Sequence, residues 1–265
     1  MNVLPSKMRR FLIIGSILLS LASGYLAGRA HLIGKVRYYL STVCVLPSSS
    51  VAPENEVASK WLLDLTLRSY SIASDPDKYD TERSSHFSYE HKSIPIDQAA
   101  LILVDVWEWH PNDGWLQRER EIIPNIVKVL EGARAHGMLV VHAPAGRATA
   151  KAVQPLPGEI IVDSSNTVPD DQELHRTLQR YGIETLFYVG FAANMCVLKR
   201  PYGMERMHQL GYEVVLLRDC TTAVEYHDTL DGMWATRLAV RYVERDLGYT
   251  ITSQDFLDGF RKRIP

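Results

Sequence analysis

From residue 99 onward, short apolar runs alternate with stretches of helical periodicity, and this alternation limits the folds that are open to the chain. The runs are too short to span a membrane and are rich in β-forming residues. We interpret them as strands that are buried on both faces of a sheet. Six such strands are expected, at residues 99–106, 138–144, 159–162, 185–191, 212–219 and 249–252.

Between these strands the apolar residues recur with helical spacing. In Glu119 to His136, for example, Ile122, Ile126 and Val129 fall on one face and Gly137 follows the last turn. Further helices are expected at 171–181, 194–210 and 228–247, and a final one after residue 252. Strands that alternate with crossover helices form a parallel sheet. We therefore predict a doubly wound, Rossmann-like α/β fold, with a mostly parallel six-stranded sheet and helices on both faces.

The N-terminus carries an uncharged apolar run, Phe11 to Gly28, preceded by Lys7, Arg9 and Arg10. As a helix this run would be roughly 27 Å long, close to the hydrocarbon thickness of a bilayer. We predict an N-terminal apolar helix that associates the chain with a membrane. Small residues near its end leave a cleaved signal peptide, and hence export, as the alternative. A buried core helix is disfavoured because the run has no polar face. Basic residues flank the run on both sides, so the side of the membrane is not predicted.

Three segments follow from these patterns: residues 1–30 as anchor or signal, 31–96 as a connector, and 97–265 as the α/β domain. The connector is polar and turn-forming, apart from an amphipathic stretch from Trp61 to Tyr70. Its aromatic residues Phe87 and Tyr89 favour partial docking onto the domain. The formal net charge of -2 argues against a nucleic-acid partner, which would require a basic face.

Candidate site residues follow the strands, because ligands bind at the carboxyl ends of parallel strands, near a switch point. Cys196 lies just after the strand at 185–191 and in the first turn of a helix. Backbone N–H groups and the helix dipole there are expected to lower the thiol pKa and to stabilise an oxyanion. The alternative is a buried structural cysteine.

Asp105 ends the otherwise apolar first strand, where a carboxylate costs free energy unless it has a partner or a task. Brought next to Cys196, it can accept the thiol proton during attack on a carbonyl. The alternative is a paired structural aspartate.

Four segments, ALILVDVW, MLVVHAP, GIETLFYVGFAANMCV and GYEVVLLRDCTT, resemble successive blocks of the isochorismatase-like cysteine hydrolase family. The resemblance covers approximately residues 97–258. It implies a catalytic Asp-Lys-Cys triad, with Asp105 as base and Cys196 as nucleophile. It also implies a cis peptide at Phe191–Ala192 and an oxyanion hole formed by the backbone amides of Ala192 and Cys196. Members of the family hydrolyse C–N bonds in small amides and ureides, and form dimers or larger rings.

The chain departs from the family at the triad lysine, whose position falls near Asp163. No lysine occurs between Lys151 and Lys199. Lys151 and Arg147 are candidate replacement cations, and His142 and His110 are candidate proton carriers. Arg200 is expected to pair with a helix end rather than to bind substrate.

The remaining candidates line a substrate pocket: Trp107, His110, His142, Phe191 and Asn194. The histidine pattern of metal-dependent nicotinamidases does not follow the second strand, so we predict no catalytic metal and no cofactor.

The leading hypothesis is a membrane-associated hydrolase, a homo-oligomer, that acts on a small-molecule amide or ureide. The alternative is a catalytically impaired family member that serves as a binding or scaffold protein, since the triad lysine is missing. A vinyl-ether hydrolase is disfavoured because that chemistry needs no thiol.

Overall fold

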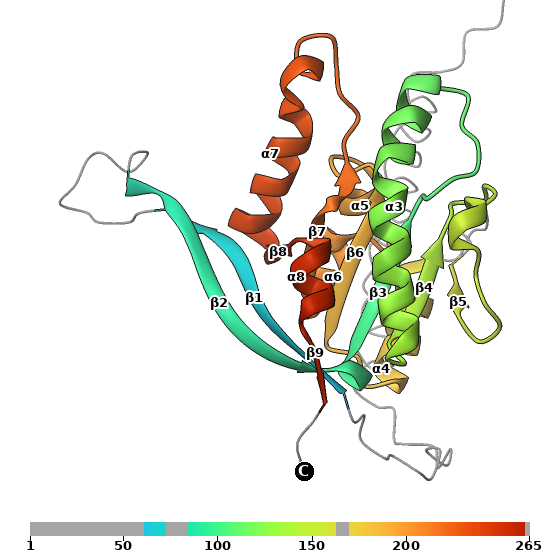
Figure 1. The fold of residues 1–265 in the computed structure, drawn as a ribbon, viewed down its shortest axis with the longest axis vertical. Helices are drawn as coiled ribbons and strands as arrows, with labels where there is room; N and C mark the ends of the chain where they lie inside the picture. The colour runs from blue at the N-terminus through green and yellow to red at the C-terminus, as the bar shows by residue number, and fades with distance from the viewer. Residues whose placement is uncertain (1–60, 73–83, 163–169, 263–265) are drawn as a thin grey trace, which may run out of the picture. The chain divides into compact units, whose positions relative to one another are not determined.

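A nine-stranded sheet organises the computed structural model, which describes residues 61–72, 84–162 and 170–262 (Figure 1). These residues belong to one unit, Val57–Pro265. The predicted N-terminal helix lies outside the described residues. Within the described ranges, no helix is both long and apolar enough to cross a membrane.

The strand order is β2-β1-β8-β7-β6-β3-β4-β5, and β9 pairs with β1. The strands are β1 (Trp61–Ser71), β2 (His86–Pro95), β3 (Ala99–Val104), β4 (Leu139–Ala143), β5 (Ile160–Ile161), β6 (Thr185–Phe191), β7 (Glu213–Thr222), β8 (Tyr249–Ile251) and β9 (Phe260–Lys262). The six predicted strands correspond to β3–β8, and they pair in parallel throughout. The mostly parallel α/β sheet is therefore confirmed.

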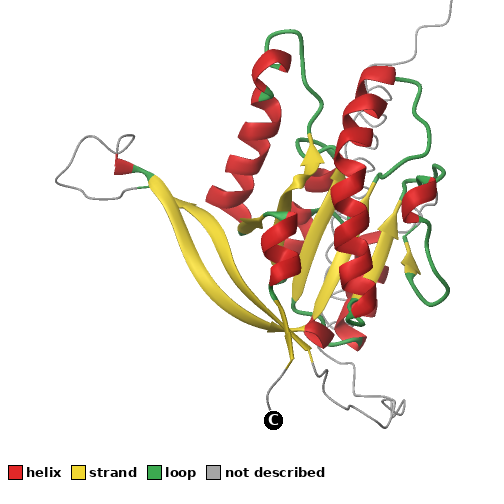
Figure 2. Cartoon of the chain, in the orientation of Figure 1, coloured by secondary structure: helices red, strands yellow, loops and turns green. Residues whose placement is uncertain are grey.

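Three antiparallel strands extend the sheet beyond the six that were predicted. β1 and β2 form a long hairpin, drawn in yellow in Figure 2, whose first strand also pairs with β8 and β9. Residues 61–71 and 86–95 had been assigned to the connector. They are instead part of the sheet, because Leu63, Leu65 and Leu67 alternate into the core.

Helices cover both faces of the sheet. They are α3 (Asp113–Ala135), α4 (Asp170–Arg180), α5 (Cys196–Lys199), α6 (Met204–Gln209), α7 (Trp234–Tyr242) and α8 (Ser253–Asp258). One core cluster joins α3 and α8 to one face of the sheet, and both helices lie on the near side in Figure 1. A second cluster joins α4, α5 and α6 to the other face. The residues of β3 alternate between the two clusters, so this strand is buried on both sides.

Two predicted long helices are interrupted in the structure. The helix expected at 194–210 is divided into α5 and α6 around Pro201 and Gly203. A Cβ atom at Gly203 would lie 2.6 Å from the carbonyl oxygen of Leu198, so this tight connection requires glycine. The helix expected at 228–247 consists of a short turn at Leu230–Gly232, then α7, then a π-helical turn at Val243–Leu247.

Candidate active site

The carboxyl ends of β3 and β6 lie side by side, and this adjacency creates the candidate site. β3 pairs with β6 on one side, where Val104 lies opposite Gly190, and with β4 on the other side. The order of the strands therefore reverses between β3 and β6, and ligands bind at such a switch point. Gly190 has φ +113, and a Cβ atom there would lie 1.9 Å from the carbonyl oxygen of Val104. Only glycine permits this close approach, which brings the residues after the two strands together.

Asp105 follows β3 in a left-handed conformation, with φ 49, and its side chain is fully buried. Its backbone N–H donates a hydrogen bond to the carbonyl oxygen of Ala143, at 3.0 Å. Burial raises the pKa of the Asp105 carboxyl, whereas the Cys196 thiol and the charge of Arg200 oppose that rise. The carboxylate is therefore a stronger base than an exposed aspartate.

Cys196 is the first residue of α5 and interacts with Asp105, which the adjacent ends of β3 and β6 make possible. The expectation that the helix start lowers the thiol pKa is wrong. Burial, followed by the negative charge of Asp105, raises the pKa of Cys196 to about 11 and outweighs Arg200 and the Ala192 amide. At neutral pH the thiol keeps its proton, so attack on a substrate requires a base.

The peptide between Phe191 and Ala192 is cis, as the family resemblance implied. The backbone N–H of Ala192 donates toward the Cys196 sulfur, and the Ala192 carbonyl accepts a hydrogen bond from Val197, at 3.1 Å. A backbone donor is therefore already directed at the reacting atom. The oxyanion hole of Ala192 and Cys196 amides stays a prediction.

Asn194 was expected in the substrate pocket, but both ends of its amide hold the loop in place. Its Nδ2 donates to the carbonyl oxygen of Val224 at 3.0 Å, and its Oδ1 accepts from the Val224 N–H at 2.9 Å. These bonds connect the loop that carries Cys196 to the segment after β7. The geometry favours a bracing role for Asn194 over substrate binding.

Four aromatic rings pack together next to the cis peptide. Trp107 stacks on His110 with ring centroids 4.6 Å apart, and His110 stacks on Trp115 at 5.1 Å. Phe191 closes the cluster, 5.8 Å from Trp107 and 5.9 Å from Trp115. The structure thus brings together the predicted Trp107, His110 and Phe191, and it adds Trp115, which the sequence analysis did not single out.

His110 is held as a neutral ring. Burial, together with the charge of Arg147, lowers its pKa. The Asn112 N–H donates to His110 Nδ1 at 3.0 Å, so the neutral ring carries its proton on Nε2. His110 can therefore donate a hydrogen bond but does not supply a positive charge at neutral pH.

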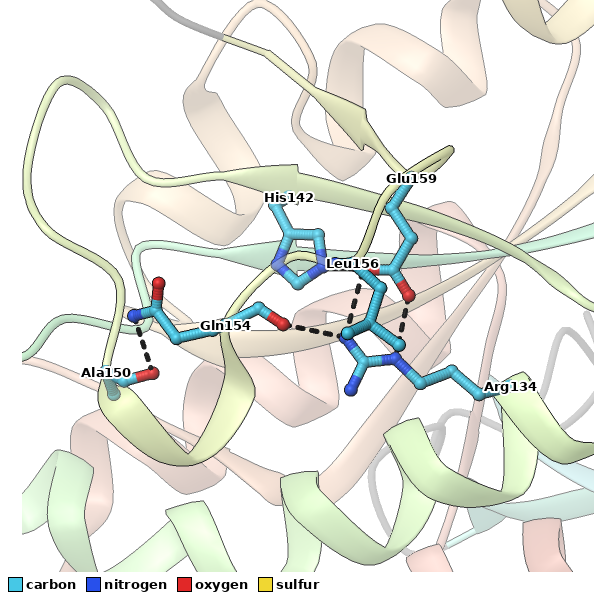
Figure 3. A network of polar contacts seen from close by, with 6 residues as sticks. All are labelled: Arg134, His142, Ala150, Gln154, Leu156 and Glu159. Carbon is cyan, nitrogen blue, oxygen red and sulfur yellow. Dashed lines mark hydrogen bonds and ion pairs between the residues drawn. The ribbon is translucent and has the colours of Figure 1, made fainter.

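His142 makes its polar contact with Glu159 rather than with the four aromatic rings (Figure 3). Its Nε2 lies 2.8 Å from Glu159 Oε2, and Glu159 also receives hydrogen bonds from the Arg134 guanidinium and the Leu156 N–H. Burial lowers the pKa of His142, although Glu159 opposes this change. The predicted pocket residue instead belongs to a buried polar network at the β4–β5 edge.

Glu119 is a second buried carboxyl, which the sequence analysis missed. It is fully buried on α3, and its Oε1 accepts a hydrogen bond from the Trp107 N–H. Burial, together with the charge of Asp105, raises its pKa to about 8. A signal was present in the sequence, because Glu119 shares the helix face of Ile122 and Ile126, which packs into the core.

Arg200 is the positively charged partner of the buried Asp105. Its Nη2 lies 3.4 Å from Asp105 Oδ2, and its charge also lowers the pKa of Cys196. The expected pairing with a helix end is therefore wrong. The sequence signal was spacing, since Arg200 lies four residues after Cys196, one helical turn away.

The two cations that the sequence analysis favoured lie elsewhere. Lys151 is 86% exposed and pairs with Glu108 at 3.4 Å. Arg147 lies over the ring of Trp107, 5.5 Å from its centroid. In the part of the chain that the structure describes, His, Cys, Asp and Glu form no group of three or more suited to a metal ion.

Comparisons with known proteins identify the family and the fold of this domain. The family model described as the isochorismatase domain matches residues 99–244. A solved cysteine hydrolase from Pseudomonas syringae pv. phaseolicola is 19% identical with a TM-score of 0.51, and the match covers 62% of this chain and 93% of that one.

Two other solved structures have lower TM-scores. An isochorismatase from Pseudomonas putida KT2440 is 21% identical with a TM-score of 0.48, and covers 61% of this chain and 91% of its own. A nicotinamidase from Staphylococcus aureus is 16% identical with a TM-score of 0.46, and covers 58% of this chain and 98% of its own. No curated protein matches the chain.

Proposed function

This chain belongs to the isochorismatase family of hydrolases, and we propose that it hydrolyses a C–N bond of a small amide or ureide through a covalent intermediate on Cys196. The observation that carries the proposal is the contact between a thiol and a buried carboxylate at adjacent strand ends. Burial raises the pKa of both groups, and a carboxylate kept beside this thiol costs free energy unless the pair has a task.

In the first step, Asp105 accepts the thiol proton as the Cys196 sulfur attacks the substrate carbonyl carbon. Negative charge moves to the carbonyl oxygen, where the backbone amides of Ala192 and Cys196 act as donors. The C–N bond then breaks, and Asp105 returns its proton to the leaving nitrogen. A thioester on Cys196 remains.

In the second step, Asp105 takes a proton from water, and the resulting oxygen nucleophile attacks the thioester carbon. The acid product leaves, and Cys196 regains its proton. Substrate binds beside Trp107, His110 and Phe191, with the His110 Nε2–H as a hydrogen-bond donor.

The test is ammonia release by the full-length chain from a panel that includes nicotinamide and N-carbamoyl amino acids. We expect turnover of at least one compound, and its loss in Cys196→Ala. Cys220→Ala is the matched control, because this second thiol is fully buried in β7 beside Asp219 and is expected to be dispensable. Activity that survives in Cys196→Ala would remove the mechanism.

The second candidate function is a binding or scaffold protein that has lost catalysis. The raised pKa of Cys196 favours this second function, because a protonated thiol is a poor nucleophile. Slow alkylation at neutral pH is expected under both functions, however, so only turnover separates them. Binding of panel compounds without ammonia release would support the second function.

Membrane association through residues 11–28 and a homo-oligomeric state complete the proposal, with export after cleavage as the alternative for the N-terminus. Membrane fractionation of the full chain, beside a variant that lacks residues 1–30, tests the anchor. Recovery of both proteins in the soluble fraction would argue against it.

A further inference from the structure

A buried carboxylate next to a partly buried thiol needs a nearby positive charge. Asp105 is fully buried, and its charge raises the pKa of Cys196, so the pair by itself disfavours a second negative charge. Proton transfer from sulfur to Asp105 places negative charge on the sulfur and then on the substrate oxygen. Without a nearby cation, this step loses electrostatic stabilisation.

The other candidate cations and titratable side chains do not provide that charge. Lys151 forms an ion pair with Glu108, and Arg147 lies over the ring of Trp107 with no described contact to Asp105. His110 is neutral, and Glu119 carries no positive charge in either protonation state. The other groups in electrostatic contact with Arg200 are Asp105, Cys196 and Tyr202.

Arg200 lies close enough to Asp105 to supply this positive charge. Its Nη2 lies 3.4 Å from Asp105 Oδ2, and the Arg200 side chain is 36% exposed while the Asp105 side chain is fully buried. Its Nε is buried and has no hydrogen-bond partner among the described residues, so the guanidinium has donor capacity to spare. Its backbone N–H donates to the Cys196 carbonyl oxygen at 3.2 Å, which fixes it one turn after the nucleophile.

Resting on the hydrolase function above, we propose that Arg200 is the cation of this site and takes the place of the triad lysine. Arg200 interacts with the proton acceptor and with the nucleophile. It therefore stabilises the negative charge on Asp105 before proton transfer and on the sulfur after it. The positive charge comes from the helix that carries the nucleophile, rather than from the segment near Asp163.

The first test needs no substrate. The alkylation rate of Cys196 by iodoacetamide is measured against pH in the full-length chain, with the rate of Cys196→Ala subtracted as background. Arg200→Gln should raise the thiol pKa and slow alkylation at pH 9 by about tenfold for each unit of increase. Arg200→Lys should restore most of the rate, because it restores the charge. An unchanged rate in Arg200→Gln would overturn the proposal.

The second test uses any compound that the wild-type chain hydrolyses. Arg200→Gln should lower kcat by about 10²–10³-fold with a smaller change in KM, and should move the acid limb of the kcat profile to higher pH. Guanidinium ion should partly restore Arg200→Ala. Lys199→Gln, which removes an exposed cation from the same helix as Cys196, is the matched control and should keep its kcat. Wild-type kcat and pH profile in Arg200→Gln, with Cys196→Ala inactive, would refute the role of Arg200 alone.

If Arg200→Gln does not fold, Arg200→Lys decides the question by the same two readouts. A wild-type thiol pKa and acid limb are expected from a cation that acts by charge. Loss of both in a folded Arg200→Lys variant would contradict that account.

Discussion

At the scale of single residues, the chemistry depends on where one proton resides. The pKa of Cys196 is about 11, while the pKa of Asp105 is raised by burial, so the resting pair is a thiol and a carboxylate. This is a base-assisted nucleophile rather than a preformed thiolate. The helix start at Cys196 did not decide the outcome, because burial and a like charge both disfavour a second anion.

Asp105→Asn should therefore raise the reactivity of the Cys196 thiol toward alkylation and lower the turnover of substrate. Removing the carboxylate charge lowers the pKa of Cys196, so its alkylation at pH 8 should become faster than in the wild type. Removing the base should reduce turnover by about 10²–10⁴-fold. Alkylation kinetics and ammonia release are measured on the same preparation. Slower alkylation in Asp105→Asn would show that the carboxylate does not hold the thiol in its protonated form.

Glu119 should make folding stability depend on pH. Its pKa rises from 4.5 in an ordinary glutamate to about 8 in the folded chain, so the folded state retains a proton that the unfolded state releases. Its contribution is most favourable below pH 4.5 and is lost as pH rises toward 8. At pH 7 the raised pKa of Glu119 lowers the free energy of unfolding by about 3 kcal/mol, relative to a glutamate whose pKa does not change on folding.

Glu119→Gln removes this titration while its amide oxygen can still accept the Trp107 hydrogen bond. The free energy of unfolding, measured by urea titration, should exceed that of the wild type by a margin that grows between pH 4.5 and 7. The exposed Glu121→Gln is the control on the same helix. A margin that does not change with pH would mean that Glu119 is ionised in the folded chain.

At the scale of secondary structure, apolar runs predicted the six parallel strands, because a strand buried on both faces needs little besides apolar residues. Adjacent ends of β3 and β6 then made the contact of Asp105 and Cys196 predictable. The hairpin was missed because polar residues surround it. Its period-two signal, Leu63, Leu65 and Leu67, is short and was interpreted only as an amphipathic stretch.

Details of the site followed from tertiary contacts that no local pattern contains. Arg200 ends α5 and pairs with Asp105, which lies 95 residues earlier in the chain. His142 has an acidic partner, Glu159, that comes from the β5 edge. The Asn194 side-chain amide is hydrogen-bonded to Val224, thirty residues later in the chain. In each case the residue was noticed, but its partner could not be predicted.

At the scale of the whole molecule, the hairpin links the two ends of the described domain. β1 pairs with β2, with β8 and with the C-terminal β9. Its three leucines, Leu63, Leu65 and Leu67, are almost completely buried in the core that α3 and α8 share. The boundary predicted at residue 97 therefore cuts through one sheet.

A fragment of residues 97–265 should not fold as the fragment 57–265 does. Burial of the three leucines contributes about 5–9 kcal/mol, comparable with the net stability of a typical domain. Their removal also leaves β8 as an unpaired edge, which favours aggregation. Circular dichroism and urea unfolding compare the two fragments, and Thr66→Ala in the longer one is the control, because its side chain is exposed on the same strand. If residues 97–265 unfold cooperatively at the same urea concentration as the longer fragment, the hairpin is an appendage and the domain begins at β3.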